Sequence, residues 1–421
     1  MLVAPFALQI YTNDMLRMRA PAALGAEKTL ANEPKQLGFV PENSASGKGS
    51  VGRVVFAPSA AESALGDAGF FAAAYRANLC LRTADRVYAR LAFFRATDFE
   101  VLFEGVKAVR WQDWFRKDVR VLVDKVRTHA SKLSSEHSVQ GVTHKAIYES
   151  LGYAWRMSNL PETGDEVTVR VYVERDEVSV LLDLSGMPLH RRGYRTAGGE
   201  APIRETLAAI LLQMMNWRRK TPLHDAFCGS GTIPIEAMLY AHNVAPGLGR
   251  AFALESLVPF SGDSARAMIA AARLDAAKAI RTDCLVRITG SDIDEQVLVS
   301  ARANAERACV IAGRALQLAG IDARIPRPDF TQASFDELAA PYDSGLLLSN
   351  PPWGERLEDK DSARALYSSM HRLFTDFPGW EFAFITSHGE FEEAIGKKAI
   401  KKKNRKTGNQ DTCFYMYSTE S

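Results

Sequence analysis

The sequence has few cysteines, and none of them is close to another. The five are spread along the chain as Cys80, Cys228, Cys284, Cys309 and Cys413. This spacing excludes a CxxC redox or zinc motif, and such sparse use of cysteine is typical of a reducing compartment. We therefore expect a cytoplasmic protein without a metal site.

Long apolar runs and a strong net charge are also missing. No run approaches the ~18 residues of a membrane span. The opening letters MLVAPFALQIY are apolar but lack the basic region of a secretory signal. We expect residues 1–14 to form an extension ahead of the folded part. The formal net charge of +2 does not by itself indicate nucleic acid, so such a partner has to be argued from local features.

The first part of the chain, residues 15–188, mixes helical and strand patterns. The alternation in VRVLV, residues 119–123, is typical of a half-buried strand, and residues 166–186 predict a hairpin that turns at Arg175 and Asp176. SVQGVTHKAIYESLGY predicts a helix with Ser138 as its cap. The pattern indicates an α+β region with antiparallel strand pairs.

The pattern of expected helices and strands changes in the second part of the chain. From residue 202 strands alternate with helices, which predicts a doubly wound α/β domain with a parallel sheet over residues 202–421. The stretch 189–201 is basic, rich in glycine and without periodicity, so we expect it to be the linker. At 421 residues the chain is long enough for two or three domains with their own cores.

A glycine-rich turn joins the first strand of this alternation to the helix that follows it. In DAFCGSGTIPIEA, small residues follow Asp225 and precede the helix, where free backbone N–H groups can receive an anion. The chain lacks the GKS or GKT of a triphosphate site, and a carboxylate suits a helix end as well as a phosphate does. A purely structural turn remains the alternative at this point.

An acidic residue after the next strand strengthens the binding interpretation. Asp292 in TGSDID ends that strand, where a carboxylate can hold a ribose diol. Asp294 competes for this role, and we favour Asp292 because it comes first after the strand. The two motifs are farther apart than in a compact βαβ unit, so we expect an insertion after the first helix.

The stretch LLLSNPPWGERL ends an apolar strand with an amide, two prolines and an aromatic ring. Prolines cannot continue a central strand, so Asn350 is expected on a stiff turn at the strand end. Its side-chain oxygen and the Pro351 carbonyl could accept the two N–H groups of an exocyclic amine, and Trp353 could stack on a base. An ordinary Pro-Pro strand exit is the alternative.

Taken in order, DAFCGSGT, GSDID and SNPPWGERL resemble class I S-adenosylmethionine-dependent amino-methyltransferases, which carry NPP followed by an aromatic residue. LDLSGMPLHRRGYR and EAPIRETLAAILL are similar to the domain junction of THUMP-domain RNA guanine-N2 methyltransferases. NVAPGLGRAF and NPPWGERL resemble the bacterial branch of that family that acts on 23S ribosomal RNA. The resemblance covers roughly residues 15–421 and is dense from Asp183 onward.

This resemblance implies both a fold and an activity. The fold is a Rossmann-like methyltransferase domain, mostly parallel with an antiparallel last strand, preceded by a ferredoxin-like and THUMP region that binds RNA. The activity is methyl transfer from S-adenosylmethionine to guanine N2 of 23S ribosomal RNA, with the base flipped into the NPPW site. A transfer-RNA guanine-N2 methyltransferase is the nearest alternative. A catalytically inactive RNA-binding ribosome-assembly factor is an alternative from another class.

The resemblance also assigns the site residues. The expected amine site is Asn350, Pro351, Pro352 and Trp353. The expected cofactor contacts are Glu205, Thr206, Asp225, Phe227, Cys228, Gly229, Ser230, Gly231, Thr232, Asp292, Ile293, Ser334 and Asn350. Ser334 stands where the family usually has an aspartate, and Asp336 competes with it for the cofactor adenine.

Two basic stretches allow both a functional and a structural interpretation. Arg191, Arg192 and Arg195 could contact RNA phosphates or simply solvate a linker. The lysine-rich run at residues 397–405 could be a nucleic-acid tail. Because CFYMYS follows it closely, we favour a mainly solvated hairpin arm.

Overall fold

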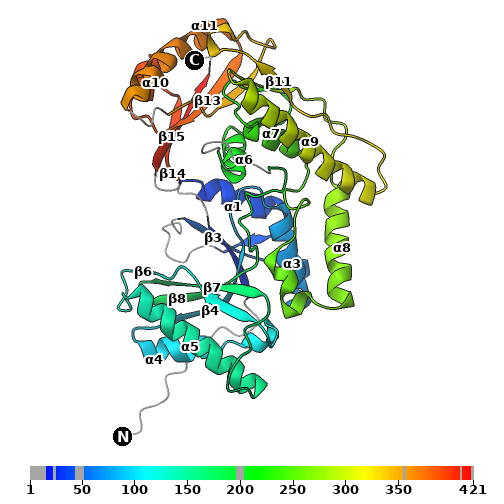
Figure 1. Cartoon of the computed structure of the whole chain (residues 1–421), viewed down its shortest axis with the longest axis vertical. Helices are drawn as coiled ribbons and strands as arrows, with labels where there is room; N and C mark the ends of the chain where they lie inside the picture. The colour runs from blue at the N-terminus through cyan, green and yellow to red at the C-terminus, as the bar shows by residue number, and fades with distance from the viewer. Residues whose placement is uncertain are drawn as a thin grey trace.

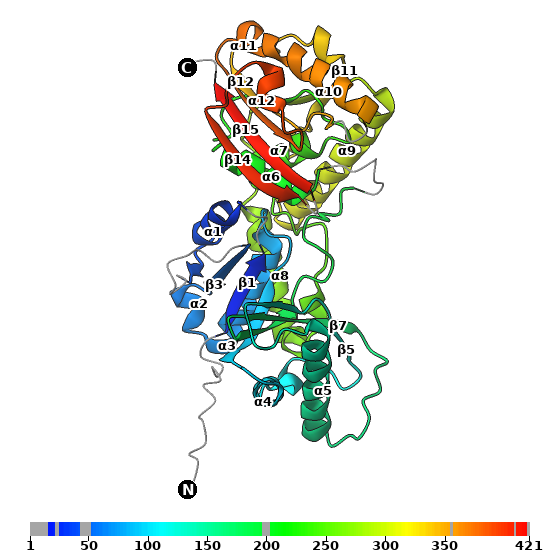
Figure 2. The same ribbon diagram turned by 90° about the vertical axis from the view of Figure 1, so that its left-hand side faces the viewer.

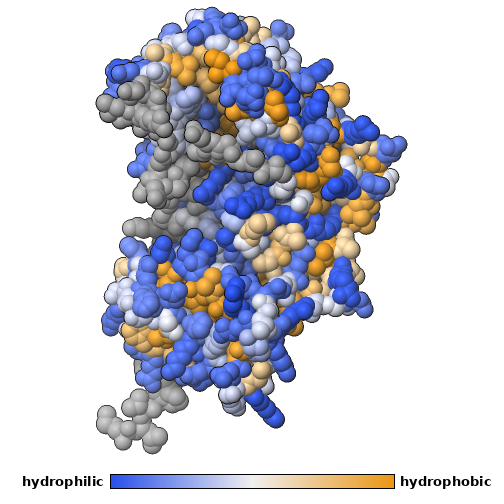
Figure 3. Space-filling model, viewed as in Figure 1, coloured by the Kyte–Doolittle hydropathy of each residue, from blue (hydrophilic) through white to orange (hydrophobic). Residues whose placement is uncertain are grey.

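The computed structural model describes residues 16–21, 25–42, 52–195, 203–353, 357–407 and 410–418. The expected N-terminal extension and the second half of the expected linker lie outside these ranges. Two sheets, one above the other along the long axis, organise the described part (Figure 1). Hydrophilic residues cover most of the face seen in Figure 3, and apolar residues form scattered groups on it. No helix in the described ranges is both long and apolar enough to cross a bilayer.

The N-terminal sheet is mainly antiparallel, with strand order β2-β3-β1-β4-β8-β7-β5 and β6 beside β7. Arg175 and Asp176 have φ angles of 53° and 67° and form the turn of the expected β7–β8 hairpin. Among the described strand pairs of this sheet, only β5–β7 and β6–β7 are parallel. The strands are β1 (Arg17–Pro21), β2 (Val40–Pro41), β3 (Arg53–Ala57), β4 (Tyr88–Arg95), β5 (Arg120–Val123), β6 (Arg127–His129), β7 (Glu166–Glu174) and β8 (Glu177–Asp183).

Helices and a cluster of aromatic rings complete this half. Trp111 and Trp114 are buried in its core, so both contribute to packing and neither is exposed for stacking on a base. The expected helix cap was misplaced by three residues, because Ser135 accepts the hydrogen bond from the Ser138 backbone N–H. The helices are α1 (Glu27–Gln36), α2 (Ala60–Ser63), α3 (Gly66–Cys80), α4 (Phe99–Lys107) and α5 (Glu136–Trp155).

The C-terminal sheet has the order β11-β10-β9-β12-β13-β15-β14. The strands from β11 to β13 are parallel, and β15 is antiparallel to both of its neighbours. The expected doubly wound fold and its antiparallel last strand are therefore confirmed. The strands are β9 (Leu223–Asp225), β10 (Ile288–Asp292), β11 (Asp329–Gln332), β12 (Gly345–Ser349), β13 (Trp380–Thr386), β14 (Lys401–Thr407) and β15 (Gln410–Ser418).

Alternation along these strands supplies a core on each face of the sheet. In β12, Leu346 and Leu348 pack with α6, α7 and α9, whereas Leu347 packs with α10, α11 and α12. Figure 2 shows β14 and β15 as a long hairpin at the sheet edge, as expected for the lysine-rich run. The helices are α6 (Glu205–Met214), α7 (Thr232–Ala241), α8 (Asp263–Lys278), α9 (Glu295–Leu318), α10 (Leu357–Ser369), α11 (Leu373–Asp376) and α12 (Phe391–Ile395).

The two halves do not separate at one point of the chain. The insertion after α7 sends Phe252, Leu254 and Phe260 into the core of the N-terminal half, and α8 lies against α3 (Figure 1). In the expected linker, Leu189 and Tyr194 are buried. The described part of this segment, residues 189–195, thus has residues packed against the two halves and is not wholly solvated.

Candidate functional site

The carboxyl edge of the C-terminal sheet brings the three sequence motifs together. β9 lies between β10 and β12, so Asp225, Asp292 and Asn350 follow three neighbouring strands. The backbone N–H of Gly229 donates to Asp292 Oδ2 at 2.9 Å. On the other side, the Ala226 N–H donates to the Ser349 hydroxyl at 2.9 Å. The glycine turn is therefore tied to both neighbouring strand ends.

The glycine turn leaves the start of α7 open to a ligand. Gly229 and Gly231 have φ angles of +50° and +82°, which L-residues rarely adopt. Gly231 precedes the first residue of α7, and no side chain of the described residues caps the helix there. The uncapped N–H groups can therefore receive a carboxylate. The buried Ser230 hydroxyl has no hydrogen-bond partner within the described ranges.

Two acidic residues that differ in burial stand beside this turn. Asp225 is fully buried, and this desolvation raises its pKa to about 7, although the Ser349 hydroxyl and the Phe227 N–H favour its ionised form. Asp292 is partly exposed and accepts the N–H of Asp294 through its second oxygen. Asp294 caps α9 by accepting the N–H of Gln296, so of the two carboxylates Asp292 is the one bonded to the glycine turn, and its role as the ribose ligand stays a prediction.

The start of α6 contributes a buried carboxylate. Glu205 is 3% exposed and faces Arg195 at 3.7 Å, while its Oε2 has no hydrogen-bond partner within the described ranges. Burial raises the pKa of this carboxyl, and Arg195 opposes the shift. An unpartnered buried oxygen of this kind suits a cationic ligand group such as an ammonium. Next to it, the Thr206 hydroxyl donates to Asp85 of the N-terminal half at 2.5 Å.

The basic stretch before α6 is mostly structural. Arg192 is buried, and its guanidinium donates to the carbonyls of Leu189 and Arg82 and faces Glu236 at 3.5 Å. The expectation of a phosphate contact is therefore wrong for Arg192, because the side chain is enclosed by protein acceptors. Arg195 is also engaged, with Glu205 and with the Thr232 hydroxyl of α7. Arg191 is exposed, and its role as an RNA contact stays a prediction.

The NPPW turn is held by hydrogen bonds from two directions. The indole Nε1 of Trp353 donates to Asn350 Oδ1 at 2.9 Å and lies 3.3 Å from the carbonyl of Ile385 in β13. The Tyr367 hydroxyl of α10 donates to the Pro352 carbonyl and lies 3.2 Å from Thr386 Oγ1. An ordinary strand exit needs none of these bonds, so the turn is built to a fixed shape.

The loop after β11 closes the site beside Asp292. The Ala333 N–H donates to the Asp292 carbonyl at 3.1 Å, which brings Ser334 to this edge. Ser334 Oγ accepts the N–H of the exposed Asp336. The Phe335 ring stacks on Phe227 of the glycine turn, with centroids 5.3 Å apart and planes 15° apart. This pair offers a flat apolar wall.

Three residues of this edge were not foreseen. Phe335 stands in the SFDEL motif, whose aromatic position could have been noticed. Tyr367 and Asp85 belong to no motif, and only the fold brings them to the site. Ile293, expected near the cofactor, is 70% exposed.

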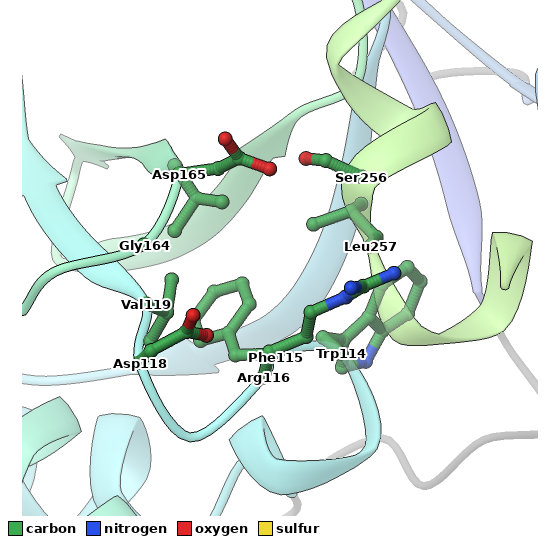
Figure 4. A pocket seen from close by; sticks show the side chains of 10 residues that line it. Trp114, Phe115, Arg116, Asp118, Val119, Gly164, Asp165, Ser256 and Leu257 are labelled. Atoms are coloured by element: carbon green, nitrogen blue, oxygen red, sulfur yellow. The ribbon is translucent and has the colours of Figure 1, made fainter.

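A hollow elsewhere in the molecule is unrelated to this edge. It lies where the loop before β5 meets the insertion, and Figure 4 shows Asp165 and Ser256 on opposite walls with Arg116 near Trp114. None of the expected site residues lines it. Within the described ranges, no group of three or more His, Cys, Asp or Glu could hold a metal ion.

Comparisons with known proteins show the family of the chain. Residues 192–415 match the family described as the RMKL-like methyltransferase domain, and residues 96–183 match the THUMP domain. The chain belongs to the RMKL-like methyltransferase family. This confirms the expected pairing of a THUMP region with a class I methyltransferase domain, and with it the expected cofactor, S-adenosylmethionine.

Relatives extend over most of the chain. "Putative RNA methyltransferase YpsC" of Bacillus subtilis is 36% identical, covering 94% of each chain. "Ribosomal RNA large subunit methyltransferase K/L" of Psychromonas ingrahamii and of Cellvibrio japonicus is 30% and 31% identical over 78% and 82% of this chain. The chain spans only 42% and 45% of the length of these two relatives.

Solved structures match over 96% of the chain. A possible methylase from Clostridium difficile 630 is 32% identical with a TM-score of 0.82, and 98% of it is covered. A putative methyltransferase complexed with SAH, SMU.472, is 31% identical with a TM-score of 0.78, also with 98% covered. A predicted N6-adenine-specific DNA methylase from Listeria monocytogenes is 36% identical with a TM-score of 0.80, with 96% covered.

Proposed function

We propose that this protein is a cytoplasmic enzyme that methylates guanine N2 in 23S ribosomal RNA. The observation that carries the proposal is the position of Asn350. It ends the strand beside the glycine turn and stands on a turn held in shape by Trp353 and Tyr367. The THUMP region on the same chain favours RNA over DNA or protein as the acceptor. The K/L names of two relatives favour the large ribosomal RNA.

The residues at this edge fit S-adenosylmethionine. The uncapped start of α7 suits its carboxylate, and the unpartnered Glu205 oxygen suits its ammonium. Asp292 would hold the ribose diol, and the wall of Phe227 and Phe335 would pack against the adenine. When bound, the cofactor supplies a methyl group whose bond to sulfur breaks as the bond to nitrogen forms.

The task of the amine site is to make a poor nucleophile react. The exocyclic amine of guanine is conjugated to the ring, so its lone pair is not free. Asn350 Oδ1 and the Pro351 carbonyl would accept its two N–H groups and favour a more tetrahedral nitrogen. The nitrogen lone pair forms the new bond, and the cationic product then loses one proton to solvent. No catalytic histidine or cysteine is needed for these steps.

The Asn350→Ala substitution tests the amine site. We expect turnover to fall by at least about 100-fold, because transition-state acceptors of this kind are worth that much, while affinity for SAH stays within a few-fold. Near-normal turnover by Asn350→Ala would refute the amine-site mechanism. Loss of SAH binding together with turnover would mean that the variant damages the cofactor site instead.

The substrate is tested by nucleoside mass spectrometry on RNA from a strain that lacks the gene and from its parent. The proposal expects N2-methylguanosine to fall in the large ribosomal RNA, and re-introducing the gene with intact Asn350 should restore it. A loss confined to transfer RNA would keep the chemistry and overturn the substrate. No change in either pool would contradict the enzyme and favour an RNA-binding assembly factor.

A further inference from the structure

The aromatic residue of the NPPW turn has a second role besides any contact with a base. We infer that Trp353 is a positioning residue whose indole N–H fixes the amide of Asn350, with the amide oxygen turned toward the acceptor amine. This inference rests on the proposed function, because it assigns how the proposed amine site is oriented. Its basis is the 2.9 Å hydrogen bond from Trp353 Nε1 to Asn350 Oδ1.

An asparagine side chain needs such a partner because its two ends are nearly equal in shape. Rotation of the Asn350 amide by half a turn would exchange the oxygen, an acceptor, for the NH₂ group, a donor. The NH₂ group would then meet the N–H groups of the substrate amine and repel them. The Trp353 indole can only donate, so it holds the oxygen on its own side. An amide oxygen has two lone pairs, and the second stays available for the substrate.

The indole is itself anchored to the sheet. Its Nε1 lies 3.3 Å from the carbonyl of Ile385, near the end of β13. β13 is paired with β12, and β12 ends one residue before Asn350. The two acceptors of the indole N–H, Asn350 and Ile385, therefore lie at the ends of adjacent strands. Asn350 is thereby held in a fixed orientation relative to the cofactor edge.

This role separates tryptophan from phenylalanine, which has no hydrogen-bond donor in its side chain. Phenylalanine could stack on a base but has no donor for Asn350, whereas the indole does both. If stacking were the whole function of position 353, Trp353→Phe would be nearly as active as the wild type and Trp353→Leu would not. If the indole N–H positions Asn350, both variants must lose turnover.

The kinetic test compares these two variants on ribosomal RNA from a strain that lacks the gene. We expect kcat to fall about 10- to 100-fold in both, since misplacing a catalytic group costs that much, while SAH affinity stays unchanged. The KM for RNA should rise clearly only in Trp353→Leu. Trp217→Phe is the matched control, because it removes an indole bond to the Thr221 carbonyl away from the NPPW turn. A Trp353→Phe enzyme as fast as the wild type, or faster, would overturn the inference.

A second test reads the hydrogen bond without requiring any activity. The chain has six tryptophans, so ¹⁵N-labelled tryptophan gives six indole signals, and Trp353→Phe identifies the one of interest. In Asn350→Ala, the Trp353 signal should shift and exchange faster with solvent. The signals of Trp111 and Trp380 should stay in place, because their indoles donate to backbone carbonyls.

An unmoved Trp353 signal would refute the hydrogen bond, whatever the enzyme methylates. Conversely, a protein that fails to methylate RNA but shows the shift would refute the proposed function and leave the bond standing. The two failures are therefore distinguishable.

Discussion

The Thr206 hydroxyl of the methyltransferase domain donates a hydrogen bond to the Asp85 carboxylate of the N-terminal half at 2.5 Å. Arg204, two residues earlier, lies 3.7 Å from the other oxygen of the same carboxylate. Between them stands Glu205, whose buried oxygen we assign to the cofactor ammonium. A residue of the RNA-binding half thus helps to fix the start of α6, on which a proposed cofactor contact depends.

We predict that Asp85→Ala weakens SAH binding about 2- to 10-fold, the worth of one lost hydrogen bond, although Asp85 is not assigned to the cofactor. Isothermal titration calorimetry measures this directly. Glu104→Ala, an exposed carboxylate on α4 of the same half, is the control. Thr206→Val should weaken binding similarly, and the double variant should be no worse than either single one. Additive losses would mean that the two residues act separately.

The raised pKa of Asp225 predicts a pH-dependent affinity for S-adenosylmethionine. Burial raises this pKa to about 7, so below pH 7 the carboxyl is mainly protonated in the free protein. If the cationic cofactor favours the ionised carboxylate, binding below pH 7 must release a proton. Affinity should then rise with pH by up to about tenfold per unit until pH 7 and level off above it.

The comparison with SAH and with Asp225→Asn isolates this effect. SAH lacks the sulfonium charge, so its affinity should depend less on pH, and Asp225→Asn should bind S-adenosylmethionine with an affinity that does not change between pH 6 and 8.

The folding stability of the free protein depends on pH in the opposite direction. A folded-state pKa above the unfolded value stabilises at low pH, and this stabilisation is lost as pH rises from about 4 through about 7. Asp225→Asn should therefore gain more in Tm at pH 8 than at pH 5.5.

Local patterns were sufficient to predict the architecture of the C-terminal half. Strand–helix alternation after residue 202 predicted the parallel sheet, because each buried strand needs a helix to return the chain in the same direction. Asp292 and Asn350 lie at one edge of this sheet, since the carboxyl ends of parallel strands share an edge, and their roles there stay predictions. These features depend on short stretches of sequence.

Features that depend on distant contacts were not predictable. Arg192 lies in a glycine-rich basic stretch and looks solvated, yet Glu236 of α7 and two carbonyls enclose it. Phe252 and Phe260 follow the glycine turn of the methyltransferase domain in sequence but join the core of the other half. An apolar residue indicates that it will be buried, but the residues next to it in sequence do not determine which part of the protein it will pack against.

Gly229 and Gly231 of the glycine turn both have positive φ angles. Substituting them tests whether this turn is purely structural, the alternative to a cofactor-binding turn. A Cβ on Gly231 would lie 2.9 Å from the Phe330 ring and 3.1 Å from the Ala301 methyl group. Among the described residues, a Cβ on Gly229 would meet nothing closer than Val297 at 4.0 Å. Both alanine variants carry the left-handed strain of about 1–2 kcal/mol, and Gly231→Ala adds an overpacking cost of about 1–3 kcal/mol.

We therefore predict that urea unfolding finds Gly231→Ala clearly less stable than Gly229→Ala. Equal losses would mean that Phe330 and Ala301 yield to the new methyl group without cost. The informative variant is then Gly229→Ala, because its added methyl group points into space that no described residue fills. If this variant keeps most of its stability but loses SAH binding, the space belongs to the ligand and the turn is a binding turn. If it keeps both, Gly229 serves only the path of the chain, and the close backbone approach proposed for the cofactor must come from Ser230 and Gly231.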